Sequence, residues 1–284
     1  MMTIAFTTFK EAVRKKLFLL VGILTFIYLS LFTIIVHFYV KDMNNNSFGN
    51  TIQIMEVASQ LISVLGFYFS SMLVALLTIV ASVSAISSEV ENGTIHSIIT
   101  KPIKRYEYIL GKYIGLGILS GVYAALLFIL VILITKVQGL PVTDTMEMSG
   151  LVKGMGFFIL QPLVILSLAI FGSSSLKSLT NGIIVVSIYI LGLIGSMMEQ
   201  IGSIIKNDSL YKFGILSSLI SPFDLIYRKM LSVVFSGVII SNPMTGGLDS
   251  GTTSPSIWMM FYIGIYLVGL LILAVLKFNK RDIS

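Results

Sequence analysis

Six long stretches without a charged side chain constrain this chain more than any other feature of its sequence. They cover residues 17–40, 57–86, 113–135, 154–176, 178–198 and 257–276, and none contains Asp, Glu, Lys or Arg. A hydrocarbon layer about 30 Å thick is crossed by about 20 apolar residues in a helix, so each stretch is long enough to span a membrane. The sequence therefore predicts an all-α polytopic membrane protein with six transmembrane helices.

The composition agrees with a membrane protein. Hydrophobic residues make up 56% of the chain and charged residues 11%, whereas a soluble domain carries about 25% charged residues. At 284 residues the chain is expected to form one membrane domain over residues 1–284. It contains no cysteine, which excludes disulfides, thiolate metal sites and a cysteine nucleophile.

The basic residues predict the orientation. With the N-terminus in the cytosol, twelve of the nineteen Lys and Arg residues lie inside and seven outside, while five acids lie inside and eight outside. Because Lys and Arg are retained on the cytosolic side, both termini and residues 87–112 are predicted to be cytosolic. We expect a multi-pass protein of the plasma membrane, in a bacterium the inner membrane.

Residues 2–16 predict a helix that lies on the membrane rather than across it. An apolar set recurs at three- and four-residue spacing: Met2, Ala5, Phe6, Phe9 and Val13. The basic residues lie mostly elsewhere around the helix, which is typical of an interfacial helix on the inner leaflet. The apolar run that follows is too long for a signal peptide and lacks a small-residue cleavage site.

The segment 199–256 is predicted to be a long outer loop that contains one amphipathic helix. Within it, Ser221-Pro222-Phe223-Asp224 is typical of a helix start, with Ser as N-cap and Pro at the first position. The apolar residues that follow predict a helix at the outer membrane surface. Glu199, just outside the fifth stretch, is interpreted as a boundary charge in water, and the alternative is that it lines an exit path.

No set of residues with catalytic or metal-binding chemistry is visible. The phosphate-binding pattern of ATPases is G-x-x-x-x-G-K-[ST], but Tyr106 stands at the position of the first glycine, and Tyr113 instead of Ser or Thr follows the only Gly-Lys pair, Gly111-Lys112. His37 and His96 are predicted to lie on opposite sides of the membrane, so they cannot share a metal ion. The chain is therefore predicted to be no enzyme and to carry no cofactor.

The third stretch begins with two pairs of small residues, Gly111/Gly115 and Gly117/Gly121, which allow helices to approach closely. We interpret them as packing within the chain rather than as a dimer seam.

The polar segment 87–112 is the best-marked docking surface in the chain. Its order is Glu89, Glu91, Gly93 and Thr94, then the apolar stripe Ile95, Ile98 and Ile99, then Pro102, Arg105 and Gly111-Lys112. One interpretation is a short amphipathic turn that folds back onto neighbouring helices. The other is an exposed apolar anchor for a partner, since burying each isoleucine would contribute about 1.5–3 kcal/mol.

This order of residues resembles the permease subunits of type-2 ABC transporters. Similar permeases act in nitrous-oxide-reductase maturation, sodium efflux and bacitracin resistance. The resemblance implies that segment 87–112 is a cytosolic coupling loop that contacts a separate ATPase. The ATPase-coupling residues would be Glu89, Glu91, Gly93, Thr94, Ile95, Ile98, Ile99, Pro102 and Arg105.

The same resemblance implies an exporter in which two ATPase subunits serve this chain and either a second copy or a homologous permease, surrounded by membrane lipid and without nucleic acid. It does not identify a substrate. Two other classes remain open: an ATP-independent channel or secondary carrier, and a membrane scaffold for a partner complex. The absence of ionisable residues from the six stretches counts against a secondary carrier.

Overall fold

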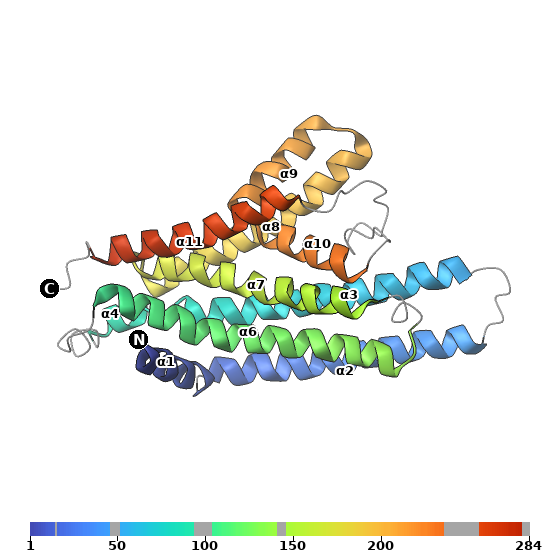
Figure 1. Cartoon of the computed structure of the whole chain (residues 1–284), viewed down its shortest axis with the longest axis horizontal. Helices are drawn as coiled ribbons and strands as arrows, with labels where there is room; N and C mark the ends of the chain where they lie inside the picture. Colours follow the sequence, from blue (N-terminus) through green and yellow to red (C-terminus); the bar gives the residue numbers. More distant parts are fainter. Residues whose placement is uncertain (15, 46–51, 94–103, 141–145, 236–255, 280–284) are drawn as a thin grey trace.

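The computed structural model describes the whole chain except residues 15, 46–51, 94–103, 141–145, 236–255 and 280–284. Every regular element in the described part is an α-helix, so the all-α class is confirmed (Figure 1). The helices are α1 (Met2–Arg14), α2 (Lys16–Asn45), α3 (Ile52–Ser82), α4 (Ser87–Glu91), α6 (Arg105–Val137), α7 (Met148–Ser173), α8 (Ser178–Ile205), α9 (Asp208–Ile220), α10 (Phe223–Val234) and α11 (Ile257–Asn279).

Within the described residues, six helices are long and apolar enough to cross a membrane, as predicted. They are α2, α3, α6, α7, α8 and α11, and α3 continues across a break into α4. The long helices run lengthwise through the molecule, and α1, α4 and the last turn of α11 lie at the same end (Figure 1). This end is called the termini end below, and the other the opposite end.

A break separates α3 from α4 at the termini end. α3 stops at Ser82, the chain turns over residues 83–86, and α4 then runs from Ser87 to Glu91. The predicted coupling loop is therefore partly helical, because residues 87–91 belong to α4 and residues 105–112 belong to α6.

After α8 the chain reverses and forms a helical hairpin with α9. The side-chain oxygen of Asn207 caps α9 by accepting hydrogen bonds from the backbone N–H groups of Ser209 (3.0 Å) and Leu210 (3.3 Å). Gly202 allows the two helices to lie close together, because a Cβ at this position would lie only 2.6 Å from the backbone nitrogen of Tyr211. Much of the predicted outer loop 199–256 is thus helical, from the last turns of α8 to Val234.

The prediction that the helix after Ser221 lies at the outer membrane surface was wrong. α10 packs against α7 inside the bundle, and the residues buried on it come from all its faces: Phe223, Asp224, Leu225, Ile226, Tyr227, Arg228, Met230, Leu231 and Val234. Its start was also misplaced, since Pro222 is the N-cap and no side chain caps the helix. Ser221 instead follows the last residue of α9.

The two glycine pairs of α6 pack within the chain, as predicted. A Cβ at Gly111 would lie 3.0 Å from the side chain of Ile4, and one at Gly115 would overlap the carbonyl oxygen of Ala5. These glycines let α1 lie directly on α6. A Cβ at Gly117 would lie 3.1 Å from Leu163, so the second pair faces α7.

Candidate functional site

The two ends of the predicted coupling loop lie at the termini end, where α4 enters it and α6 leaves it (Figure 1). Glu89 and Glu91 lie on α4, and Arg105 is the first residue of α6. The other predicted site residues on the loop, Thr94, Ile95, Ile98, Ile99 and Pro102, lie outside the described residues. The apolar centre of the site therefore stays a prediction, while its supports can be described.

Gly93 ends α4 in the left-handed conformation. Its φ is +69°, a value that glycine adopts without a steric cost, and its N–H donates to the carbonyl of Val90 (3.2 Å). The glycine terminates the helix before it, which sets the direction in which the chain leaves α4.

A buried ion pair joins α4 to α6. Lys112 Nζ lies 2.5 Å from Glu89 Oε1 and 2.5 Å from the carbonyl oxygen of Ala85, and the lysine is only 3% exposed. The hydroxyl of Tyr108 donates to the second oxygen of Glu89. A buried charge is tolerated when it is paired and hydrogen-bonded, so these contacts keep α4 against the first turns of α6.

α4 is hydrogen-bonded to the two residues on either side of the turn between α7 and α8, the last residue of α7 and the first residue of α8. The backbone N–H groups of Ile86 and Ser87 donate to Ser173 Oγ at 3.0 and 2.9 Å. In return, Glu91 Oε1 accepts a hydrogen bond from the backbone N–H of Ser178 (2.7 Å), the first residue of α8. A carboxylate at that position also faces the positive end of the α8 dipole.

Asn181 of α8 stabilises the break between α3 and α4. Its Nδ2 donates to the carbonyl oxygens of Val83 (2.8 Å) and Ala169 (2.9 Å), and the residue is fully buried. A carbonyl at a helix break lacks its helical partner and needs another one when it is away from water. The amide thus links α3, α7 and α8 at one point.

The other end of the loop is attached to α11. Arg105 Nη1 donates to the carbonyl oxygens of Asn279 (2.9 Å) and Phe278 (3.3 Å), which belong to the last turn of α11. One turn further along α6, the ring of Tyr108 stacks on the ring of Phe278 with centroids 5.7 Å apart. A cation at a helix C-terminus is favourable, so Arg105 holds α6 and α11 together.

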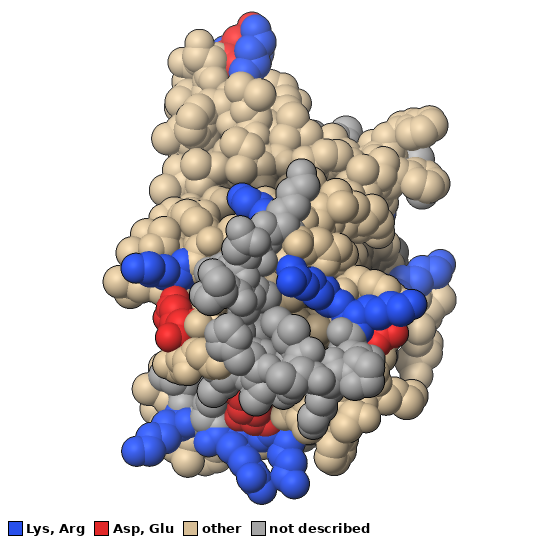
Figure 2. Space-filling model, turned by 90° about the vertical axis from the view of Figure 1, so that its left-hand side faces the viewer, with Lys and Arg blue, Asp and Glu red and all other residues tan. Residues whose placement is uncertain are grey.

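Exposed cations surround the termini end. Figure 2 views this end and shows Lys and Arg side chains spread around its rim. The exposed ones include Lys10, Arg14, Lys16, Lys104, Lys177 and Lys277. This arrangement is typical of the cytosolic face of a membrane protein.

A second polar cluster lies nearer the opposite end, between α8 and α10. Arg228 binds Glu199 with two contacts, 2.7 Å from Nη2 to Oε2 and 3.3 Å from Nη1 to Oε1, and its Nε lies 2.8 Å from Asp224 Oδ2. The interpretation of Glu199 as a boundary charge in water was therefore wrong. Burial raises the pKa of Asp224, and the neighbouring guanidinium partly offsets that effect.

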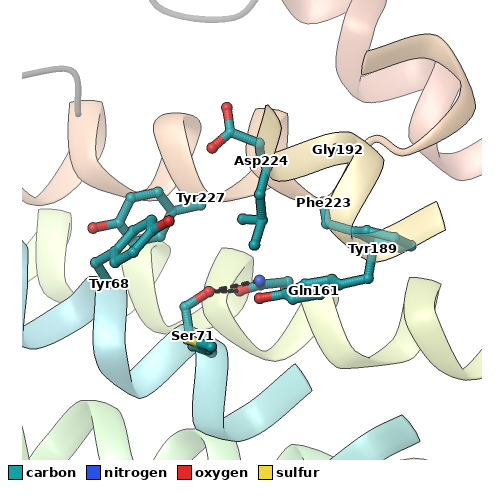
Figure 3. Close-up of a pocket in the computed structure, with 10 residues that line it drawn as sticks. Tyr68, Ser71, Gln161, Tyr189, Gly192, Phe223, Asp224 and Tyr227 are labelled. Atoms are coloured by element: carbon teal, nitrogen blue, oxygen red, sulfur yellow. Dashed lines mark hydrogen bonds between the residues drawn. The ribbon is translucent and has the colours of Figure 1, made fainter. Parts of the chain in front are cut away.

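A small cavity beside this cluster is lined by residues of α3, α7, α8 and α10, among them Tyr68, Tyr189 and Tyr227 (Figure 3). Within it Gln161 Nε2 donates to Ser71 Oγ (2.7 Å), and the carboxylate of Asp224 points away from that pair (Figure 3). The cavity measures about 10 Å³, which is room for about one water molecule. It is too small for a transported compound in this conformation.

Sequence reasoning missed both buried ion pairs. Lys112 and Glu89 are 23 residues apart, and Arg228 and Glu199 are 29 residues apart, so no local sequence pattern predicts either ion pair. Only the spacing of Asp224 and Arg228, one helical turn apart, was a usable signal. Within the described residues, no group of three or more His, Cys, Asp or Glu side chains could hold a metal ion.

Six membrane-length helices within the described residues define a multi-pass membrane protein. Residues 2–283 match the family described as ABC-2 family transporter protein. The chain therefore belongs to the ABC-2 family and is a transporter membrane component of the permease type. No curated protein matches it.

Proposed function

We propose that this chain is the membrane-spanning subunit of an ABC exporter and that a separate ATPase drives it through residues 87–112. The observation that carries the proposal is the way both ends of this loop are fixed. The start is bound to α7 and α8 through Ser173 and Glu91, and the end is bound to α11 through Arg105. A force on residues 94–103 would reach α7, α8 and α11 through these short contacts, of which the one to Ser173 is buried.

The energy source must come from another polypeptide. Lys112, the lysine of the only Gly-Lys pair, lies inside α6 and is bound to Glu89, so it cannot reach a nucleotide phosphate. ATP binding and hydrolysis therefore belong to an associated subunit. Two ATPases would serve two membrane subunits, this chain and either a second copy or a homologous permease.

Ile95, Ile98 and Ile99 are the proposed anchor for that ATPase. Isoleucines three and four residues apart present one apolar face if the segment is helical. Burying each would contribute about 1.5–3 kcal/mol, which is enough to fix a docked loop. Rim charges, among them Glu91 and Lys104, would then set the register with the partner.

Co-purification tests the proposal. A tagged chain is expected to bring down an ABC ATPase, and Ile98→Asp is expected to weaken that association at least tenfold, because about 1.4 kcal/mol corresponds to a factor of ten. Ser97→Asp is the matched control, since it adds the same charge one residue away and keeps all three isoleucines. Equal retention of the ATPase by wild type and Ile98→Asp contradicts the docking role.

Reconstituted transport separates the other two classes. An ATP-independent channel or carrier would move its substrate without ATP when an ion gradient is supplied. A scaffold would assemble its partners when ATP turnover is blocked and would move nothing. The proposed exporter requires both the ATPase and ATP, and its transport stops when either is left out.

A further inference from the structure

α1 carries three different faces, each repeating every three or four residues. Ala5, Thr8 and Ala12 are buried and face α6, as the contact of Ala5 with Gly115 shows. An exposed apolar face consists of Met2, Phe6 and Val13, with Phe9 half-buried beside it. The third face is exposed and polar, and it contains Thr3, Thr7, Lys10 and Arg14.

We propose that this helix and the first residue of α2 form a binding surface for anionic phospholipid headgroups. The cations are Lys10, Arg14 and Lys16, and all three are exposed. None forms an ion pair with a carboxylate of the described part of the chain. Their charge is therefore available to an external anion.

The neighbouring apolar face identifies the partner as a lipid surface. Met2 is 90% exposed and Phe6 is 68% exposed, on a short helix that has no other element of the described structure covering this face. A helix with an apolar face next to a basic face lies in the boundary between headgroups and acyl chains. An acidic protein would match the cations but would leave the two large apolar side chains in water.

The size of the expected effect follows from the number of cations. Each Lys or Arg near an anionic membrane surface strengthens binding about fivefold at physiological salt. Three such residues give a preference on the order of a hundredfold for an anionic over a zwitterionic headgroup. This preference falls as salt rises, since the Debye length shortens.

The surface is connected to the buried ion pair of α4 and α6. Gly111 and Gly115, which contact α1, lie on either side of Lys112, which binds Glu89. Lipid bound at α1 would therefore fix the position of the first turns of α6. An effect of this lipid on transport rests on the proposed coupling function, whereas lipid binding itself does not.

Native mass spectrometry tests the lipid surface. The full-length protein is released from bilayers that contain equal amounts of phosphatidylglycerol and phosphatidylcholine, and the retained lipids are counted. Wild type is expected to retain phosphatidylglycerol preferentially, and the triple variant Lys10→Gln, Arg14→Gln, Lys16→Gln is expected to lose at least tenfold of that preference. The matched control removes three exposed cations away from the termini end: Lys41→Gln, Lys153→Gln and Lys212→Gln.

A charge-conserving variant separates lipid binding from folding. Lys10→Arg, Arg14→Lys, Lys16→Arg keeps all three charges and is expected to retain phosphatidylglycerol as wild type does. If wild type and the glutamine variant retain phosphatidylglycerol with the same preference over phosphatidylcholine, the proposal is overturned. If the glutamine variant keeps the lipid but loses the ATPase in co-purification, the surface belongs to a protein partner and the proposal is equally overturned.

Discussion

At the scale of single residues, the termini end depends on a charged side chain that is almost completely buried. Lys112 is enclosed by the carbonyl of Ala85, the carboxylate of Glu89 and the ring of Tyr108, whose centroid lies 5.4 Å from Nζ. Desolvating the two charges is costly, and the contacts repay this cost only while both partners are present. The pair is therefore better understood as fixing one arrangement of α4 than as adding net stability.

Replacement of Lys112 tests this account. Lys112→Met leaves Glu89 partly buried without its cation, and we expect the free energy of unfolding to fall by about 3–5 kcal/mol. The double variant Lys112→Met, Glu89→Gln is expected to recover part of the loss, because no buried charge remains. Thermal unfolding of the purified protein in detergent measures both. Lys104→Met, at an exposed cation of the same end, is expected to change stability by less than about 0.5 kcal/mol.

Gly115 provides a second test at this scale. A Cβ there would overlap the carbonyl oxygen of Ala5, so Gly115→Ala must push α1 away from α6, at a cost of about 1–3 kcal/mol. Limited proteolysis is expected to cleave the first residues of the variant sooner than those of wild type. Gly22→Ala is the control, because a Cβ at Gly22 has no heavy atom within 4 Å. Identical cleavage of Gly115→Ala and wild type would show that α1 does not need this glycine.

At the scale of elements, α10 is fixed inside the bundle by its charges as well as by its apolar side chains. Arg228 joins it to α8 through Glu199, and the hydroxyl of Tyr227 donates to the backbone carbonyl of Val64 in α3 (2.9 Å). These contacts hold the short helix against its neighbours in the bundle, where it packs mainly on α7.

Arg228→Met is expected to destabilise the protein by about 3–5 kcal/mol, because two carboxylates lose their cation. The loss in free energy of unfolding is expected to be larger at about pH 8 than at about pH 5. The direction of this pH dependence follows from the carboxyl of Asp224, whose ordinary pKa is about 4. Burial already raises this pKa, and Arg228 lowers it, so removing the arginine raises it further. A raised carboxyl pKa contributes stability at low pH that is lost as the pH rises.

Unfolding of the variant and wild type at both pH values gives the comparison. Lys212→Met on α9 serves as the control, since it removes an exposed cation. A pH-independent difference between Arg228→Met and wild type would contradict the explanation.

The turn between α7 and α8 gives an element-scale prediction about coupling. Ser173→Ala leaves the N–H groups of Ile86 and Ser87 without their partner, and we expect a loss of about 1–3 kcal/mol. In the reconstituted complex, the variant is expected to keep ATPase binding but to transport less substrate for each ATP hydrolysed. Ser167→Ala is the matched control, because Ser167 is equally buried on α7 and bonds only to the carbonyl of Val164 in its own helix. An unchanged ratio of transport to hydrolysis in Ser173→Ala would contradict a role of this turn in coupling.

The sequence predicts the six long helices well, because uncharged stretches of membrane length have no alternative in a helical protein. It also predicts the packing role of the glycine pairs of α6, since small residues at four-residue spacing let helices approach closely. The sequence fails to predict the position of α10, because this helix is amphipathic but its polar residues Asp224 and Arg228 are buried as well. That burial depends on Glu199, which comes from another helix, and a local pattern contains no information about a partner 29 residues away.

At the scale of the whole molecule, the two ends of the bundle differ in what they offer. The end opposite the termini has an aromatic core around Phe67, whose ring lies 5.1 Å from that of Phe128 between centroids, and a cavity with room for about one water molecule. The termini end has a loop whose supports reach α7, α8 and α11. Under the proposed function, a force received at the termini end would move helices that extend to the opposite end.

Thiol labelling at position 98 tests this view most directly. The chain contains no cysteine, so Ile98→Cys introduces a unique thiol, and Lys212→Cys does the same at an exposed position of α9. A membrane-impermeant maleimide is expected to label position 212 in intact cells, and position 98 only after permeabilisation and less when the ATPase is bound. Labelling of position 98 in intact cells, or labelling that the ATPase does not reduce, would contradict the claim that this loop receives the ATPase.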